Sequence, residues 1–132
     1  MIVGAVLLDT TVLIDALRGR EAANRLRDLR RAGDVPYTCA VNVEEVVRGL
    51  RAGEENAVAR LLIGLRIAPL GRRQGELAGR WRREFSERGT TLSQADCLVA
   101  SAAAGLGARL ATGNPRDFPM DEVAIEHWPA GA

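Results

Sequence analysis

The chain has 132 residues, of which 47% are apolar and 27% charged, and its formal net charge is +1. This size and balance predict one soluble globular domain over residues 1–132 and exclude a disordered chain. No apolar run approaches the roughly 20 residues of a membrane span, so we expect no membrane association. A net charge near zero gives no argument for nucleic-acid binding.

The residue inventory restricts the available chemistry. All basic residues are arginines, which excludes a Schiff base, a phosphate-loop lysine and a lysine general base. The single histidine, His127, excludes a histidine-rich metal site, so any metal would be held mainly by carboxylates, which suit Mg²⁺ or Mn²⁺. Two cysteines without metal-ligand spacing, and an N-terminus without the basic start of a signal peptide, predict a cytoplasmic protein.

The first predicted elements are a strand and a helix that meet at an aspartate. Ala5–Leu8 is a short, continuous apolar run, typical of a strand buried on both faces. Asp9 follows it, and apolar residues recur at helical spacing over residues 12–17. A carboxylate at the end of a buried parallel strand lies where open α/β sheets bind ligands. The alternative is that Asp9 only caps a turn or helix.

The middle of the chain alternates between helical and extended patterns. The predicted elements are helices over residues 21–31, 42–50 and 55–65 and strands over residues 35–41 and 66–70. Asn42 is predicted to cap its helix. Glu45 lies in the first turn, where the helix dipole favours an acid. The apolar face of this helix would comprise Val43, Val46, Val47 and Leu50.

The last part of the chain begins with the longest predicted helix, residues 72–88. Its core-facing stripe would comprise Leu77, Ala78, Trp81 and Phe85. Ser93 opens an alanine-rich helix, with Asp96 at capping-box spacing. Strands are predicted at residues 109–112 and 123–127, with Trp128 covering the last one. The alternation predicts an α/β fold with a parallel sheet of four or five strands and helices on both faces.

Four acids are expected at one edge of this sheet: Asp9, Glu45, Asp96 and Asp117. Each follows a parallel strand or lies near the start of a helix that packs there. Carboxylates in one cleft repel each other unless a cation joins them. One or two Mg²⁺ or Mn²⁺ ions could activate water there and stabilise the charge that develops in a phosphodiester displacement.

Four sequence blocks resemble a known family: LLDTTVLID, EVVRGL, LSQADCLVASAA and LATGNPRDF. Their order and spacing resemble the signature of PIN-domain ribonucleases and, more narrowly, of VapC-type toxins of bacterial toxin–antitoxin pairs. The resemblance implies a PIN-like three-layer sandwich and a metal-dependent endoribonuclease. It makes Asp9, Glu45 and Asp96 the core acids, with Asp9 and Asp96 as metal ligands.

The end of the fourth block departs from the family pattern. Some family members carry their fourth acid at the position of Asn114 and others at that of Asp117, and only the second is acidic here. Thr112 matches the small hydroxyl residue that is common at the end of this strand. The resemblance therefore leaves open whether Asn114 or Asp117 completes the site.

The resemblance also implies three partners: an RNA substrate, a cognate VapB-type antitoxin and a second copy in a homodimer. An acidic cleft beside apolar helices would suit a helical peptide whose arginine reaches the carboxylates. The apolar residues in question are Val43, Val46, Val47, Leu61 and Leu62. Two alternatives remain. These residues could face the domain's own core, or the chain could be a non-catalytic PIN-fold module that binds RNA or protein.

Overall fold

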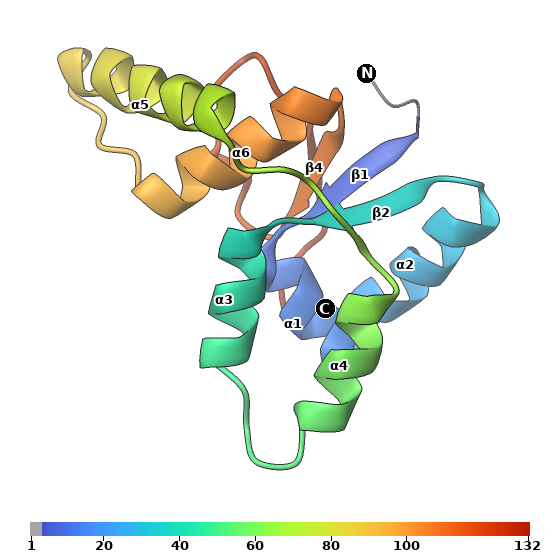
Figure 1. Cartoon of the computed structure of the whole chain (residues 1–132). Helices are drawn as coiled ribbons and strands as arrows, with labels where there is room; N and C mark the ends of the chain where they lie inside the picture. Colours follow the sequence, from blue (N-terminus) through green and yellow to red (C-terminus); the bar gives the residue numbers. More distant parts are fainter. Residues whose placement is uncertain (1–3) are drawn as a thin grey trace.

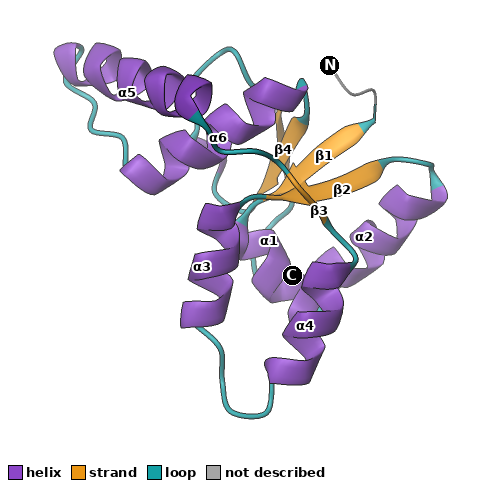
Figure 2. Ribbon diagram, in the orientation of Figure 1, coloured by secondary structure: helices purple, strands orange, loops and turns teal. Residues whose placement is uncertain are grey.

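A parallel sheet forms the centre of the molecule (Figure 2). The computed structural model describes residues 4–132, and the first three residues of the predicted domain lie outside them. The sheet order is β3-β2-β1-β4-β5, and all neighbouring pairs are parallel. Its strands are β1 (Ala5–Leu8), β2 (Val35–Thr38), β3 (Arg66–Ile67), β4 (Arg109–Thr112) and β5 (Ile125–His127). The predicted α/β fold with four or five parallel strands is confirmed.

Helices cover both faces of the sheet, which gives three layers (Figure 1). They are α1 (Thr10–Leu17), α2 (Glu21–Arg31), α3 (Ala40–Arg48), α4 (Glu55–Ile63), α5 (Arg72–Glu87) and α6 (Gln94–Leu106), and a 3₁₀ turn, η1 (Pro115–Asp117), follows β4. One core lies between the sheet and α5–α6, and the other lies between the sheet and α1, α2 and α4. No described helix has the length and apolarity needed to cross a bilayer.

The central strand β1 is buried on both faces, as its apolar run predicts. Ala5 and Leu7 join the core under α5 and α6, whereas Val6 and Leu8 join the opposite core. The Asp9 amide then donates to the carbonyl oxygen of Ala111 at 2.9 Å, so the ends of β1 and β4 are held level. This pairing places the side chain of Asp9 at the carboxyl edge of the sheet.

Helix α3 begins earlier than predicted, and its cap is a different residue. Strand β2 ends at Thr38, so residues 39–41 are not extended strand, and Cys39 is the N-cap. Asn42 lies in the first turn, and its side-chain oxygen accepts a hydrogen bond from the Cys39 amide at 3.3 Å. The prediction of Asn42 as N-cap is therefore wrong. The pattern of apolar residues could not show that this polar side chain faces inward.

The predicted apolar face of α3 is only partly buried. Val46 is 1% exposed, but Val47 is 51% exposed and is an open apolar residue on the surface. Strands β3 and β5 are also shorter than predicted, since β3 ends at Ile67 and β5 begins at Ile125. Ile67 is itself exposed, because β3 is the outermost strand of its side of the sheet.

Helix α5 packs along α6 by the predicted stripe (Figure 1). Trp81 is 1% exposed and Ala78 is 4% exposed, and Leu77 and Phe85 pack against the same core. The Trp81 indole donates to Glu122 Oε2 at 2.7 Å, which ties α5 to the segment before β5. These contacts fix α6 over the sheet and so determine where its first turn lies.

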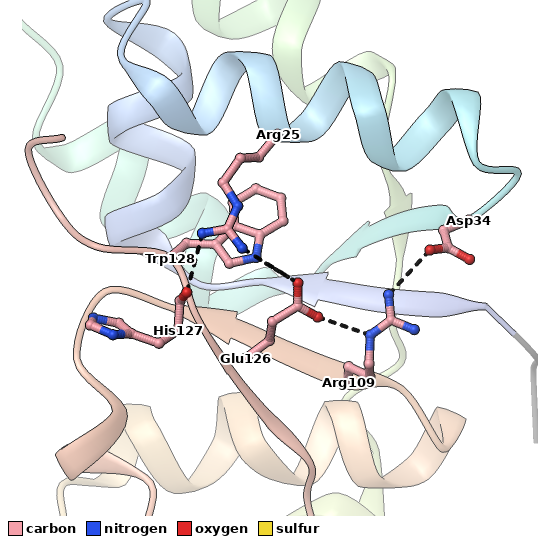
Figure 3. Close-up of polar contacts among 6 residues, drawn as sticks. All are labelled: Arg25, Asp34, Arg109, Glu126, His127 and Trp128. Atoms are coloured by element: carbon pink, nitrogen blue, oxygen red, sulfur yellow. Dashed lines mark hydrogen bonds and ion pairs between the residues drawn. The ribbon is translucent and has the colours of Figure 1, made fainter.

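A charged network closes one side of β5 (Figure 3). Arg109 contacts both Asp34 and Glu126, at 3.2 and 3.0 Å. Arg25 of α2 lies over the ring of Trp128, 4.7 Å from its centroid. Trp128 is 3% exposed, and its indole donates to Glu126. Trp128 therefore packs in the core on the side of α2, and its coverage of the edge of the last strand stays a prediction.

Candidate active site

Asp9 is the most buried of the predicted acids and is 7% exposed. Its Oδ2 accepts a hydrogen bond from Thr112 Oγ1 at 2.8 Å, and its Oδ1 accepts one from Asn42 Nδ2 at 3.4 Å. The residue holds the N-cap position of α1, but its side chain makes no capping hydrogen bond there. Both oxygens are instead directed by residues from other elements, β4 and α3.

Burial raises the pKa of Asp9 to about 6, against an ordinary value of 3.8. The hydrogen bond from Thr112 works in the opposite direction, because it stabilises the charged form. The negative charges of Asp96 and Glu45 add to the upward shift of this pKa. Asp9 therefore senses two of the other predicted acids.

Helix α3 is joined to the start of α1 by side-chain hydrogen bonds. Thr10 Oγ1 donates to Glu45 Oε1 at 2.6 Å, and Asn42 Nδ2 donates to Thr10 Oγ1 at 3.1 Å. The side-chain oxygen of Asn42 accepts from the amide and the thiol of Cys39. Asn42 is completely buried. Its side chain contacts Asp9 directly and is linked to Glu45 through Thr10.

Asn42 is the site residue that sequence reasoning missed. The sequence predicts it only as a helix cap, although it lies three residues before Glu45 and therefore on the same face of the helix. Two features of the sequence indicate a role in the site for Asn42. One is its spacing from Glu45, and the other is that it is a polar residue on the inward face of the helix, where an apolar residue would be expected.

Asp96 lies in the first turn of α6 and is half-buried. Its amide donates to Ser93 Oγ at 3.1 Å, so Ser93 caps α6 as predicted. Burial raises the pKa of Asp96; its contact with Ser93 lowers it, and the charges of Asp117 and Glu45 raise it further. Asp96 is therefore near enough to Asp117 and Glu45 to sense both charges.

The turn after β4 holds the remaining predicted residues. Thr112 is fully buried, and its hydroxyl also accepts a hydrogen bond from the Asn114 amide at 3.0 Å. The side chains of Asn114 and Asp117 are exposed. Asp117 ends η1, and its charge acts on Asp96, whereas Asn114 takes part through its backbone.

The acid set suits a hard cation in its chemistry but is not a preformed metal cage. Its donors are all oxygens, and no described arginine contributes to the pKa of Asp9 or Asp96. Within residues 4–132, no group of three or more His, Cys, Asp or Glu side chains is arranged closely enough to hold a metal ion. The acids at this edge act on one another's charge without forming a closed set of ligands.

An apolar groove of about 690 Å³ lies on the same helix as Glu45. It is lined by Ala40, Val43, Glu44, Val47, Arg48 and Ile67. Of the apolar residues predicted to receive a peptide, Val43 and Val47 line this groove, Val46 is in the core, and Leu61 and Leu62 pack against the core. The expectation of an exposed apolar surface therefore holds for part of the set.

Comparison with known proteins identifies the family. Residues 6–125 match the PIN domain family. Ribonuclease VapC10 of Mycobacterium tuberculosis is 35% identical over 122 residues, which are 89% of this chain and 88% of that protein. Ribonuclease VapC19 of the same organism is 35% identical over 122 residues, covering 86% of this chain and 92% of that protein.

Solved structures agree on the fold. VapBC2 from Rickettsia felis, solved bound to a promoter DNA fragment, superposes with a TM-score of 0.80 at 22% identity, covering 94% of this chain and 98% of that one. FitAcB from Neisseria gonorrhoeae gives a TM-score of 0.75 at 24% identity, covering 94% and 97% of the two chains. The matched sequence family and the shared three-layer architecture show that this chain belongs to the PIN-domain family.

Proposed function

We propose that this protein is a metal-dependent endoribonuclease that hydrolyses RNA phosphodiester bonds and acts as the toxin of a toxin–antitoxin pair. The observation that carries the proposal is the buried Asp9 carboxylate, whose pKa is raised by burial and by the charges of Asp96 and Glu45. Such a group is costly at neutral pH unless a cation binds it. Ribonucleases VapC10 and VapC19, each 35% identical to this chain over 122 residues, support the same reaction.

Asp9 and Asp96 are the residues that would hold Mg²⁺ or Mn²⁺, and Glu45 and Asp117 would complete the site. When bound, the ion supplies an activated water and stabilises negative charge on the phosphate. Thr112 and Asn42 orient the two oxygens of Asp9. Thr10 holds Glu45 against the end of β1.

The alternative function is a non-catalytic PIN-fold module that binds RNA or protein. The retention of all four acids, and the two hydrogen bonds that direct Asp9, favour catalysis, because a binding module would not require this buried charge.

The proposed toxin needs an inhibitor, and the groove on α3 supplies a surface for one. Val43, Val47 and Ile67 present an apolar lining that suits the apolar face of a helical VapB-type antitoxin. We further propose that the protein forms a homodimer and acts in the cytoplasm, where its RNA substrates are.

Replacing either proposed metal ligand should abolish cleavage. Asp9→Asn and Asp96→Asn each remove a charge from the ion's ligands, so cleavage of a structured RNA in Mg²⁺ or Mn²⁺ should fall by more than about 100-fold, the upper cost of losing only an outer-shell partner. Asp121→Asn, an exposed acid outside the site, is the matched control and should cleave normally. Chelation should inactivate the parent. Unchanged cleavage by both ligand variants would refute the assignment.

The raised pKa of Asp9 predicts a characteristic pH dependence of stability. Between about pH 4 and 6 the folded state keeps a proton on Asp9 that the unfolded state releases, so the free energy of unfolding should fall as pH rises through this window. Asp9→Asn removes the titration and should be more stable than the parent at pH 7, by at most about 3 kcal/mol. Urea denaturation from pH 4 to 8 without metal measures both proteins. If the free energy of unfolding changed with pH in the same way for both proteins, the result would contradict the raised pKa of Asp9.

Thr112 offers a test of how Asp9 is held in its charged form. Thr112→Val removes the hydroxyl that donates to Asp9 Oδ2, so the pKa of Asp9 should rise further. The acidic limb of the kcat/KM profile should then shift to higher pH by roughly one unit. Thr112→Ser keeps the donor and should keep the parent profile. Identical shifts in both variants would show that the hydroxyl is not responsible.

Expression in a bacterial host tests the toxin proposal. The parent chain alone should slow growth, Asp9→Asn should not, and co-expression of the adjacent reading frame should restore growth. Val47→Arg places a charge in the apolar groove and should prevent rescue while purified protein still cleaves RNA. A harmless parent that purifies as a monomer without a bound peptide would favour the non-catalytic module.

A further inference from the structure

A second hollow, of about 380 Å³, lies at the same edge of the sheet as the acids. It is formed by the turn after β4 and the end of β5, and its lining residues are Gly113, Asn114, Pro115, Arg116, Asp117 and His127. Its volume falls within the roughly 300–1,000 Å³ that is typical of small-ligand sites. Most of its side chains are polar or charged, whereas the groove on α3 is lined mainly by apolar side chains beside Glu44 and Arg48.

The hollow adjoins the acid set through the strand ends. His127 pairs with Thr112 in the β4–β5 register, and the Trp128 amide donates to the carbonyl oxygen of Thr112 at 2.9 Å. Thr112 in turn donates to Asp9. Asp117 lines the hollow and acts electrostatically on Asp96. A group in the hollow would therefore lie next to whatever the carboxylates hold.

The turn that forms the hollow is anchored. The Gly113 amide donates to Thr11 Oγ1 at 3.0 Å, and a Cβ at this position would lie 2.9 Å from Ala130 Cβ. Phe118, directly after η1, is 3% exposed and packs in the core. The hollow is thus a built feature of the fold rather than a gap beside a free loop.

Two of its side chains match the chemistry of a nucleotide. Arg116 is exposed and carries a guanidinium suited to bidentate contact with a phosphate. His127 is exposed, and in Figure 3 its imidazole points away from the Arg25–Glu126 network. Unstacked RNA bases commonly stack on such a ring. The charge of Arg116 would also offset that of Asp117, which lines the same hollow and which an approaching phosphate would meet.

We propose that this hollow binds the nucleotide next to the scissile bond of single-stranded RNA, with Arg116 on its phosphate and His127 stacked on its base. The proposal rests on the proposed ribonuclease function, because it places substrate beside the acid set. It makes Arg116 and His127 RNA-positioning residues that lie outside the carboxylate site.

The test measures RNA binding separately from cleavage. Fluorescence anisotropy would follow a short, labelled, mixed-sequence single-stranded RNA binding to full-length Asp9→Asn protein in Mg²⁺, alone and combined with Arg116→Ala, His127→Ala or His127→Phe. Arg83→Ala, on the exposed face of α5, is the matched charge control. Thermal unfolding of each variant checks its fold, and cleavage by the parent is assayed in parallel.

Arg116→Ala should weaken binding and reduce the slope of log K against log salt by about 0.7, the value for one lost contact to a single-strand phosphate. Arg83→Ala should leave the slope unchanged. His127→Ala should weaken binding by at least about fivefold, and His127→Phe should restore it because the phenyl ring also stacks. A structural role for His127 would not give this rescue.

Equal RNA affinity in all variants would overturn the proposal. If the parent cleaves RNA under these conditions, the ribonuclease function stands even when the hollow fails. The parent could fail to cleave RNA while Arg116→Ala and His127→Ala still weaken RNA binding. That result would support RNA binding in the hollow, and the non-catalytic module would replace the nuclease as the function.

Discussion

The burial of one carboxylate, that of Asp9, is the constraint on which the site depends. Strand β1 is enclosed by two cores, so the residue that ends it is largely removed from water. Thr112 and Asn42 supply hydrogen bonds that partly replace the lost hydration. They do not cancel its cost, since the pKa of Asp9 stays near 6. The fold thereby holds at the carboxyl edge of the sheet a carboxylate whose charged form is disfavoured by burial.

Separate elements bring the other acids to Asp9, and each is positioned by its own packing. Asn42 and Thr10 fix α3 and so place Glu45. The packing of α5 along α6, in a core that includes Trp81, places Asp96. A destabilised site supported by a well-packed scaffold is expected of catalytic proteins, because the stability lost at the site is recovered in the cores.

The sheet order separates two surfaces around the acids. Ile67 of β3 belongs to the apolar groove, and His127 of β5 belongs to the polar hollow, and these are the two outermost strands with β1 between them. An apolar helical partner and an RNA strand would thus meet opposite sides of the same site. This arrangement would allow each contact to be changed by substitution without altering the other.

The sequence by itself determined β1, the stripe on α5 and the Ser93 cap, because each depends on spacing within a few residues. Only the tertiary structure decided the role of Asn42, the exposure of Val47 and the link between Thr112 and Asp9. Those features depend on side chains that meet across 33 and 103 residues of chain, in the cases of Asn42 and Thr112 with Asp9. A local pattern reports which face of an element is apolar, but the partner that a polar side chain finds is fixed only when distant strands and helices pack together.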